Sequence, residues 1–301
     1  MASRDELIVL NKDEDAVWFL DAADGTCLHS VPVGSNPHEV AITPDGSVAY
    51  VSNAVGNSIS VIATEAMEET GRIEHPEFQF PHDIKITPDG VKMYVAVTYA
   101  HKVFVYERPT HELIKIIPTG QRLSHMLAPT PDWTQIYIPN LGSNTVSILN
   151  TETDQIEKHI AVGKTPEGVA VHPSGEFLYV ANQDDDDFMV FDAEKHGLIA
   201  RGSIGDTPVR LVFSPDGRLA LTANRTSHDV SVICAVRHRE IKRIPVGRWP
   251  GGIVFDTAGK RAFVANNKTN DISVLDMDAL EEVDRFDAGI HPDGIGFLHA
   301  A

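Results

Sequence analysis

The sequence contains little cysteine and few basic residues for its length. Cys27 and Cys234 are its two cysteines among 301 residues, and they fall in separate parts of the chain, which argues against a disulfide framework. Lys and Arg total 25 against 43 Asp and Glu, which gives a formal net charge of −18. Nucleic acid and anionic membrane surfaces bind basic stripes, so this balance argues against both and leaves a small-molecule substrate as the expected partner.

Signals of several other protein classes are also missing. No apolar run is long enough to span a bilayer, and residues 1–10 lack the long apolar core of a signal peptide. We therefore expect a cytoplasmic protein as the chain stands; a secreted or periplasmic location would require that a leader was removed. The chain has no Gly-x-Ser-x-Gly elbow, no phosphate-binding glycine loop and no Cys-x-x-Cys pair, so none of those catalytic sites is expected.

The chain does contain a repeat. Residues 36–53 show its most complete copy, in which NPHEVAITPDG is followed by one serine and then by VAYVSN. A proline, or serine in one case, opens each copy at positions 37, 81, 124, 166, 208, 250 and 292. The spacings are 44, 43, 42, 42, 42 and 42 residues. A period this regular indicates a repeat architecture.

Each repeat predicts four short strands, with a Pro-Asp-Gly turn or a variant of it between the first two and a polar loop between the second and third. Helical periodicity is almost absent. Four strands per unit predict an all-β fold, a seven-bladed β-propeller of four-stranded blades. The closing blade is expected to combine residues 5–33 with residues 292–299, so that N-terminal strands pair with the C-terminal strand and leave no open edge. We expect one propeller domain over residues 1–301, self-sufficient as a monomer.

The second strands carry a recognisable motif. It reads Tyr50-Val-Ser-Asn53, Tyr94-Val-Ala-Val97, Tyr179-Val-Ala-Asn182 and Phe263-Val-Ala-Asn266, each after a Pro-Asp-Gly turn or a variant of it. These segments resemble the YVTN family of β-propeller repeats, and the resemblance covers essentially the whole chain. It implies the propeller fold but does not select an activity, because broadly similar propellers include lactonases, a streptogramin lyase and a domain of nitrous oxide reductase. The asparagine that ends most of these strands is predicted to cap the following loop.

One position differs among the repeats in a way that indicates chemistry. The residue after the proline or serine is, in chain order, His38, His82, His125, Glu167, Val209, Gly251 and Asp293. Because the first strand of a blade is innermost, the polar members are predicted to form a continuous arc at one mouth of the channel. Imidazole and carboxylate groups are ligands for divalent transition metals. We predict that His38, His82, His125 and Glu167 bind one such ion, with zinc, manganese, iron and copper not distinguished; the alternative is that each histidine contacts the neighbouring blade's backbone.

Other residues are predicted to complete this site. Asp293 is the candidate acid or base, and Arg210, one residue past the ring position, is the second candidate catalytic residue. Arg225, His228 and His101 lie on loops that should overhang the same mouth, where they are predicted to bind an anionic substrate. The histidines at 29, 75, 111, 159, 172, 196 and 238 fall on outer strands or turns and receive no role.

Three functions remain open from the sequence. The favoured one is a metal-dependent enzyme that acts on a small anionic molecule by hydrolysis, lactone opening or elimination. The second is an oxidoreductase that uses copper or iron in the same site of three histidines and one glutamate, since the ligand set alone does not select the metal. The third is a non-catalytic propeller that binds a protein or a ligand on its loop face.

Overall fold

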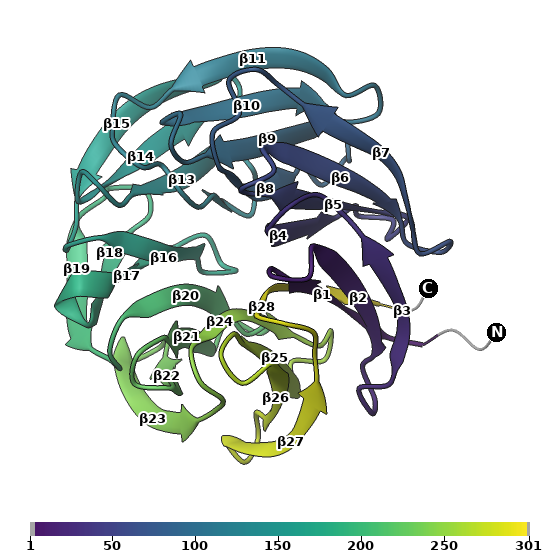
Figure 1. Cartoon of the computed structure of the whole chain (residues 1–301). Coiled ribbons are helices and arrows are strands. Elements are labelled where there is room, and N and C mark those ends of the chain that lie inside the picture. The colour runs from purple at the N-terminus through teal and green to yellow at the C-terminus, as the bar shows by residue number, and fades with distance from the viewer. Residues whose placement is uncertain (1–3, 300–301) are drawn as a thin grey trace.

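The structure is a computed structural model in which residues 4–299 are described. Over this range the chain forms seven four-stranded antiparallel sheets arranged around a central channel (Figure 1). The seven-bladed propeller predicted from the repeat is therefore confirmed. Between residues 4 and 299, no helix is long and apolar enough to cross a membrane.

The strands of each blade follow one another from the channel outward. Blade one contains β4 (Pro37–Ile42), β5 (Val48–Asn53), β6 (Ser58–Ala63) and β7 (Glu68–Glu74). Blade two contains β8 (Pro81–Ile86), β9 (Lys92–Val97), β10 (Lys102–Glu107) and β11 (Glu112–Pro118). Blade three contains β12 (Ala128–Pro129), β13 (Gln135–Asn140), β14 (Thr145–Asn150) and β15 (Gln155–Ala161). Blade four contains β16 (Pro166–Val171), β17 (Phe177–Asn182), the 3-10 turn η1 (Gln183–Asp185), β18 (Asp187–Asp192) and β19 (Leu198–Ser203). Blade five contains β20 (Pro208–Phe213), β21 (Leu219–Asn224), β22 (Asp229–Cys234) and β23 (Arg239–Pro245). Blade six contains β24 (Pro250–Phe255), β25 (Arg261–Asn266), β26 (Asp271–Asp276) and β27 (Glu281–Asp287).

Blade seven joins the two ends of the chain. Its order is β28 (Pro292–Leu298), β1 (Glu6–Asn11), β2 (Ala16–Asp21) and β3 (Cys27–Pro32). The innermost strand β28 runs antiparallel to β1, with Leu7 opposite Phe297. This is the predicted closure, and it pairs the edge of β1 that would otherwise be open.

Blade three departs from the repeat at its inner strand. Only Ala128 and Pro129 pair as a strand with β13, while Ser124 forms an isolated bridge to Asn140. The register would place Met126 opposite Pro139, and proline has no N–H to donate to the ladder. The interrupted segment is held instead by the Leu127 N–H, which donates to Asp83 Oδ2 at 2.8 Å.

The hydrophobic core is divided among the contacts between blades. Seven apolar clusters occur in the described residues, one at each of the seven blade interfaces. The second and third strands are covered on both faces by neighbouring blades, which explains their almost uninterrupted apolar sequences. No blade buries its faces alone, so the ring is stabilised as a whole.

The tyrosine of the second-strand motif links one blade to the next. Its hydroxyl reaches the outer turn of the following blade in the pairs Tyr50–His111, Tyr94–Asp154, Tyr137–His196 and Tyr179–His238. Three of the histidines that received no role from the sequence therefore join neighbouring blades. The motif's asparagine caps the loop after its strand, as predicted: Asn53 Nδ2 donates to Ser58 Oγ at 3.1 Å and to Ser60 Oγ at 2.9 Å.

The residue before each inner strand has a left-handed backbone. These rim residues are Asn36, Phe80, Leu123, Thr165, Thr207, Trp249 and His291, with φ between 49° and 64°. Each rim N–H donates to a side chain of the preceding blade, namely Asp15, Asn57, His101, Asn144, Asp186, His228 and Asn270. These seven bonds fix the point from which each inner strand starts and therefore position the side chains at the channel mouth.

Candidate functional site

The arc predicted from the sequence is present at the channel mouth. Asp293 Oδ2 lies 2.9 Å from His38 Nδ1, and the rings of His38 and His82 are 4.5 Å apart. The rings of His82 and His125 stack at 3.6 Å, and His125 Nε2 lies 4.0 Å from Glu167 Oε1. Four of these side chains begin inner strands, whereas His125 lies in the interrupted segment of blade three. Repeat spacing alone thus brings all five together in the predicted order.

The histidines do not converge as metal ligands. Within residues 4–299, no group of three or more His, Cys, Asp or Glu side chains is arranged to hold a metal ion. The stacked planes of His82 and His125 differ by only 28°, so their in-plane lone pairs point side by side and do not meet at one point. His125 Nδ1 is also 3.0 Å from Thr98 Oγ1. The side chains as placed do not fit the predicted ion, whose binding stays a prediction.

The two stacked histidines are held neutral. Burial lowers the pKa of both His82 and His125 well below the usual value of 6.5, and the neighbouring histidines and arginines shift each pKa in the same direction. A low pKa follows because two imidazolium rings in contact would repel each other in a poorly solvated site.

Asp293 is ionised and orients His38. Burial alone would raise the pKa of Asp293, but Lys12 and His38 outweigh burial and hold this pKa well below 3.8. Lys12 Nζ donates to Asp293 Oδ2 at 3.2 Å. The close approach of β28 to β4 requires glycine at 294, where a Cβ would lie 2.3 Å from the His38 carbonyl oxygen. Asp293 therefore contacts His38 through Nδ1 and leaves Nε2 for another partner.

Glu167 has the opposite character. Its side chain is 11% exposed, and burial raises its pKa from 4.5 to about 7, since Arg225 and Arg210 only partly offset the desolvation. Arg225 Nη2 lies 3.9 Å from Glu167 Oε1, beyond the range of a direct hydrogen bond. Glu167 can consequently carry a proton near neutral pH, and Arg225 keeps donors free for a ligand.

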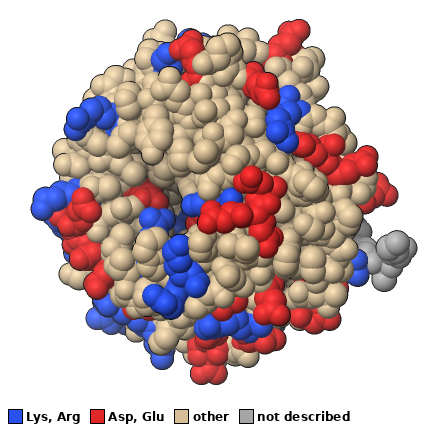
Figure 2. All heavy atoms as spheres, in the orientation of Figure 1, with Lys and Arg blue, Asp and Glu red and all other residues tan. Residues whose placement is uncertain are grey.

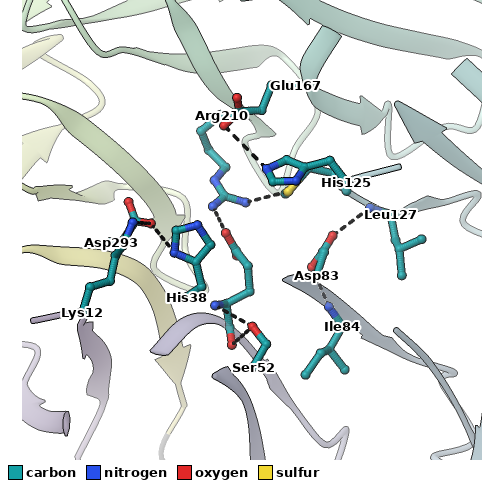
Figure 3. A network of polar contacts seen from close by, with 12 residues as sticks. Lys12, His38, Ser52, Asp83, Ile84, His125, Leu127, Glu167, Arg210 and Asp293 are labelled. Carbon is teal, nitrogen blue, oxygen red and sulfur yellow. Dashed lines mark hydrogen bonds and ion pairs between the residues drawn. The ribbon is translucent and has the colours of Figure 1, made fainter. Parts of the chain in front are cut away.

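A buried ion pair forms the floor beneath the arc. Arg210 of β20 donates through Nη2 to Glu39 Oε1 of β4 across the channel, and its Nη1 lies 3.8 Å from Met126 Sδ (Figure 3). Burial would lower the pKa of Arg210, but Glu39 outweighs it and keeps the guanidinium charged. Figure 3 shows Arg210 between His38 and His125.

The arc opens into a cavity of about 370 Å³ at the channel mouth. Its polar lining includes Lys12, His38, His125, Glu167, Arg225 and Asp293, and its apolar lining includes Phe80, Tyr99, Leu123, Leu141 and Trp249. Figure 2 shows the centre of the ring hollowed, with acidic and basic side chains next to each other around the hollow. This size and mixed lining suit a small molecule.

Four of the predicted residues lie outside the cavity lining, and His82, which stacks on His125, is one of them. Arg210 is in the floor, whereas His101 and His228 accept the N–H of the rim residues Leu123 and Trp249 through Nδ1, at 3.0 Å and 3.3 Å. Asp or Asn performs that task in the other blades. The structure therefore gives both histidines a positioning contact; their predicted role in substrate binding stays a prediction.

The residue after the proline or serine of each repeat, here called the ring position, predicts only part of the site. The next residue in each repeat gives Glu39 and Asp83, both buried, as well as Arg210. The residue before the proline gives Phe80 and Trp249. Lys12 follows the second strand of blade seven, at the loop position read in the other blades but not in this one. Comparing the residue before the proline and the two residues after it in every repeat would have revealed most of these residues.

Comparisons with known proteins agree with the fold. The profile of a family described as YNCE-like beta-propeller matches residues 47–299. Similar solved structures include a functionally unknown protein from Desulfotomaculum acetoxidans (18% identity, TM-score 0.84, 98% of this chain and 99% of that one). The Pseudomonas aeruginosa periplasmic gluconolactonase (18%, 0.81, 99% and 99%) and Kuenenia stuttgartiensis hydrazine synthase (21%, 0.81, 88% and 90%) are also similar. No curated protein matches in sequence.

Proposed function

The chain belongs to the YNCE-like beta-propeller family, and from the geometry of its channel mouth we propose that it is a hydrolase that opens a small ester or lactone. The observation that carries this proposal is the presence of two acid–base pairs, Asp293–His38 and Glu167–His125, in one cavity beside Arg225. A related fold in a periplasmic gluconolactonase supports the reaction class, although fold alone does not assign it.

Each pair has a distinct role in the proposed reaction. His38, oriented through Nδ1 by Asp293, takes a proton from water at Nε2 while the water oxygen attacks the substrate carbonyl. The negative charge that develops on the carbonyl oxygen is stabilised by Arg225. The bond from the carbonyl carbon to the ring or ester oxygen breaks, and protonated Glu167 gives that oxygen its proton. Water is consumed, and one carboxylic acid and one alcohol are formed. The proton taken up by His38 then passes through solvent to Glu167, which restores both groups.

These roles differ from those predicted from the sequence. The low pKa of Asp293 suits a carboxylate that orients His38 better than one that exchanges protons. Arg210 is engaged by Glu39 in the floor, so we assign the cationic role to Arg225.

The experiment is a pH-indicator assay of hydrolysis over a panel of lactones and simple esters. We expect His38→Asn and Glu167→Gln to lower kcat by about 10²–10⁴-fold, the range for loss of general acid or base catalysis. His29→Asn is the matched control, because His29 is exposed on the outer strand β3 and should retain full activity. A folded wild type that hydrolyses no member of the panel, or a His38→Asn protein that keeps full activity, overturns the proposal.

Metal binding by His38, His82, His125 and Glu167 is tested separately, and no step above depends on it. Metal content is measured by mass spectrometry on untagged protein and on His82→Ala. One equivalent of zinc, manganese, iron or copper in the wild type, absent from the variant, would show that the histidines rearrange around an ion. A coloured or paramagnetic sample would then favour the oxidoreductase alternative.

A further inference from the structure

Aromatic side chains occupy two of the seven rim positions. Phe80 and Trp249 precede the inner strands of blades two and six, and both have left-handed backbones, with φ of 64° and 57°. This conformation is disfavoured for bulky residues, and blade one fills the same position with Asn36, which adopts it more readily. The backbone therefore gives no reason for an aromatic residue here.

Phe80 packs against the rings of His38 and His82, whose centres lie 5.6 Å and 6.1 Å from its own, but burial gives no reason for the exposed aromatic surface beside it and at Trp249. Trp249 is 39% exposed, and Tyr99, whose ring centre is 4.9 Å from that of Phe80, is 55% exposed. Lys268 Nζ lies 5.3 Å from the centre of the Trp249 ring. Exposed aromatic surface at a cavity mouth commonly marks a binding surface.

The two aromatics face each other across the cavity. Blades two and six are three blades apart in one direction and four in the other, which is as nearly opposite as a ring of seven permits. Phe80, Tyr99 and Trp249 all line the same cavity as His38, Glu167 and Arg225. The cavity lining is therefore apolar on two sides and carries polar groups between them.

We propose that the ligand is amphipathic, with a carboxyl-derived head group beside His38, Glu167 and Arg225 and an apolar tail lying between Phe80 and Trp249. The head group rests on the proposed function, since it is the ester or lactone carbonyl, or the carboxylate that hydrolysis releases. The tail rests on the rim alone. A medium-chain alkyl lactone fits this description, whereas a lactone bearing only hydroxyl groups leaves both aromatic faces uncovered.

The first test uses calorimetric titration with octanoate and with propionate, which share the head group and differ in the tail. We expect octanoate to bind the wild type at least about tenfold more tightly than propionate, and Phe80→Asn or Trp249→Asn to weaken octanoate binding by about tenfold. Propionate binding should change by less than about twofold in Trp249→Asn. The substitutions copy the residue of blade one, so the rim backbone is retained, and Val236→Asn at an 80% exposed position is the matched control.

Octanoate that binds no more tightly than propionate, or rim variants that bind octanoate like the wild type, would overturn the proposal. A second assay compares kcat/KM for δ-decalactone and δ-valerolactone and separates the two proposals. Hydrolysis without a preference for the alkyl chain or an effect of the rim variants refutes the rim assignment but not the reaction. Rim-dependent octanoate binding without lactone hydrolysis refutes the reaction but not the rim.

Discussion

Replacing Glu167 with glutamine should remove a cost to folding that depends on pH. In the folded protein the pKa of Glu167 is about 7, compared with 4.5 for an unperturbed glutamate. Between these two values the unfolded chain releases the proton while the folded chain retains it. The contribution of this group to the free energy of unfolding therefore falls as pH rises through the window, and it is constant above about pH 7.

The magnitude follows from the size of the shift. A rise of about 2.5 units at about 1.4 kcal/mol per unit corresponds to a cost of about 3 kcal/mol once the carboxyl is fully ionised. Glutamine keeps the shape and has no proton to lose. We therefore expect Glu167→Gln to gain about 3 kcal/mol of stability relative to the wild type between pH 4.5 and pH 8.

Urea denaturation at constant ionic strength, repeated at intervals from pH 4.5 to pH 8, measures this difference. Comparing variant with wild type at each pH cancels the titration of every other group. Glu194→Gln, at an exposed turn of blade four, supplies the baseline for removing a surface carboxylate. A difference between Glu167→Gln and wild type that stays constant over the whole range would refute the assignment of a raised pKa to Glu167.

Three further changes probe the arc, the floor and the blade contacts. The pKa of His82 in the folded protein lies below 6.5, so the contribution of His82 to stability is present above pH 6.5 and is lost as the pH falls below that value. His82→Phe keeps a ring that can stack on His125 but cannot take up a proton. Urea titration should therefore show that the variant loses less stability towards pH 5 than the wild type does. Arg210→Met leaves the Glu39 carboxylate buried without its partner and should cost about 3–5 kcal/mol by denaturation, while adding Glu39→Gln should recover most of the loss. Tyr179→Phe removes the bond to His238 and should cost about 1 kcal/mol, whereas Tyr106→Phe, whose hydroxyl has no partner among residues 4–299, should be close to neutral in the same assay.

The sequence predicts the fold well because its repeat period and its turn residues both encode the blade. The positions of β5 and β17, the closure of β28 on β1 and the order of the arc all follow from spacing. The interrupted strand of blade three could be anticipated only from the register, which places Pro139 where the ladder needs a donor. Spacing identifies which side chains meet, but not how they are oriented.

Orientation decides the chemistry of this site. His38, His82, His125 and Glu167 would serve as metal ligands if their lone pairs met at one point. The proposed reaction instead uses two separate acid–base pairs, with His38 beside Asp293 and with His125 stacked on His82 and near Glu167. That choice depends on Lys12, Thr98 and Arg225, which lie on loops outside the ring position.

The departures from sevenfold symmetry locate the function more sharply than any single motif does. Residues that the repeats share, such as the motif tyrosine and the loop-capping asparagine, are explained by contacts between or within blades. At the channel mouth the repeats instead differ in charge, size and aromaticity, and the differences are costly: a carboxyl buried at Glu167, and aromatic rings on strained backbone at Phe80 and Trp249. A scaffold that needed only to close its ring would have no physical reason to retain either cost. Their coincidence in one cavity is the strongest reason to regard that cavity as the site where this propeller binds its ligand.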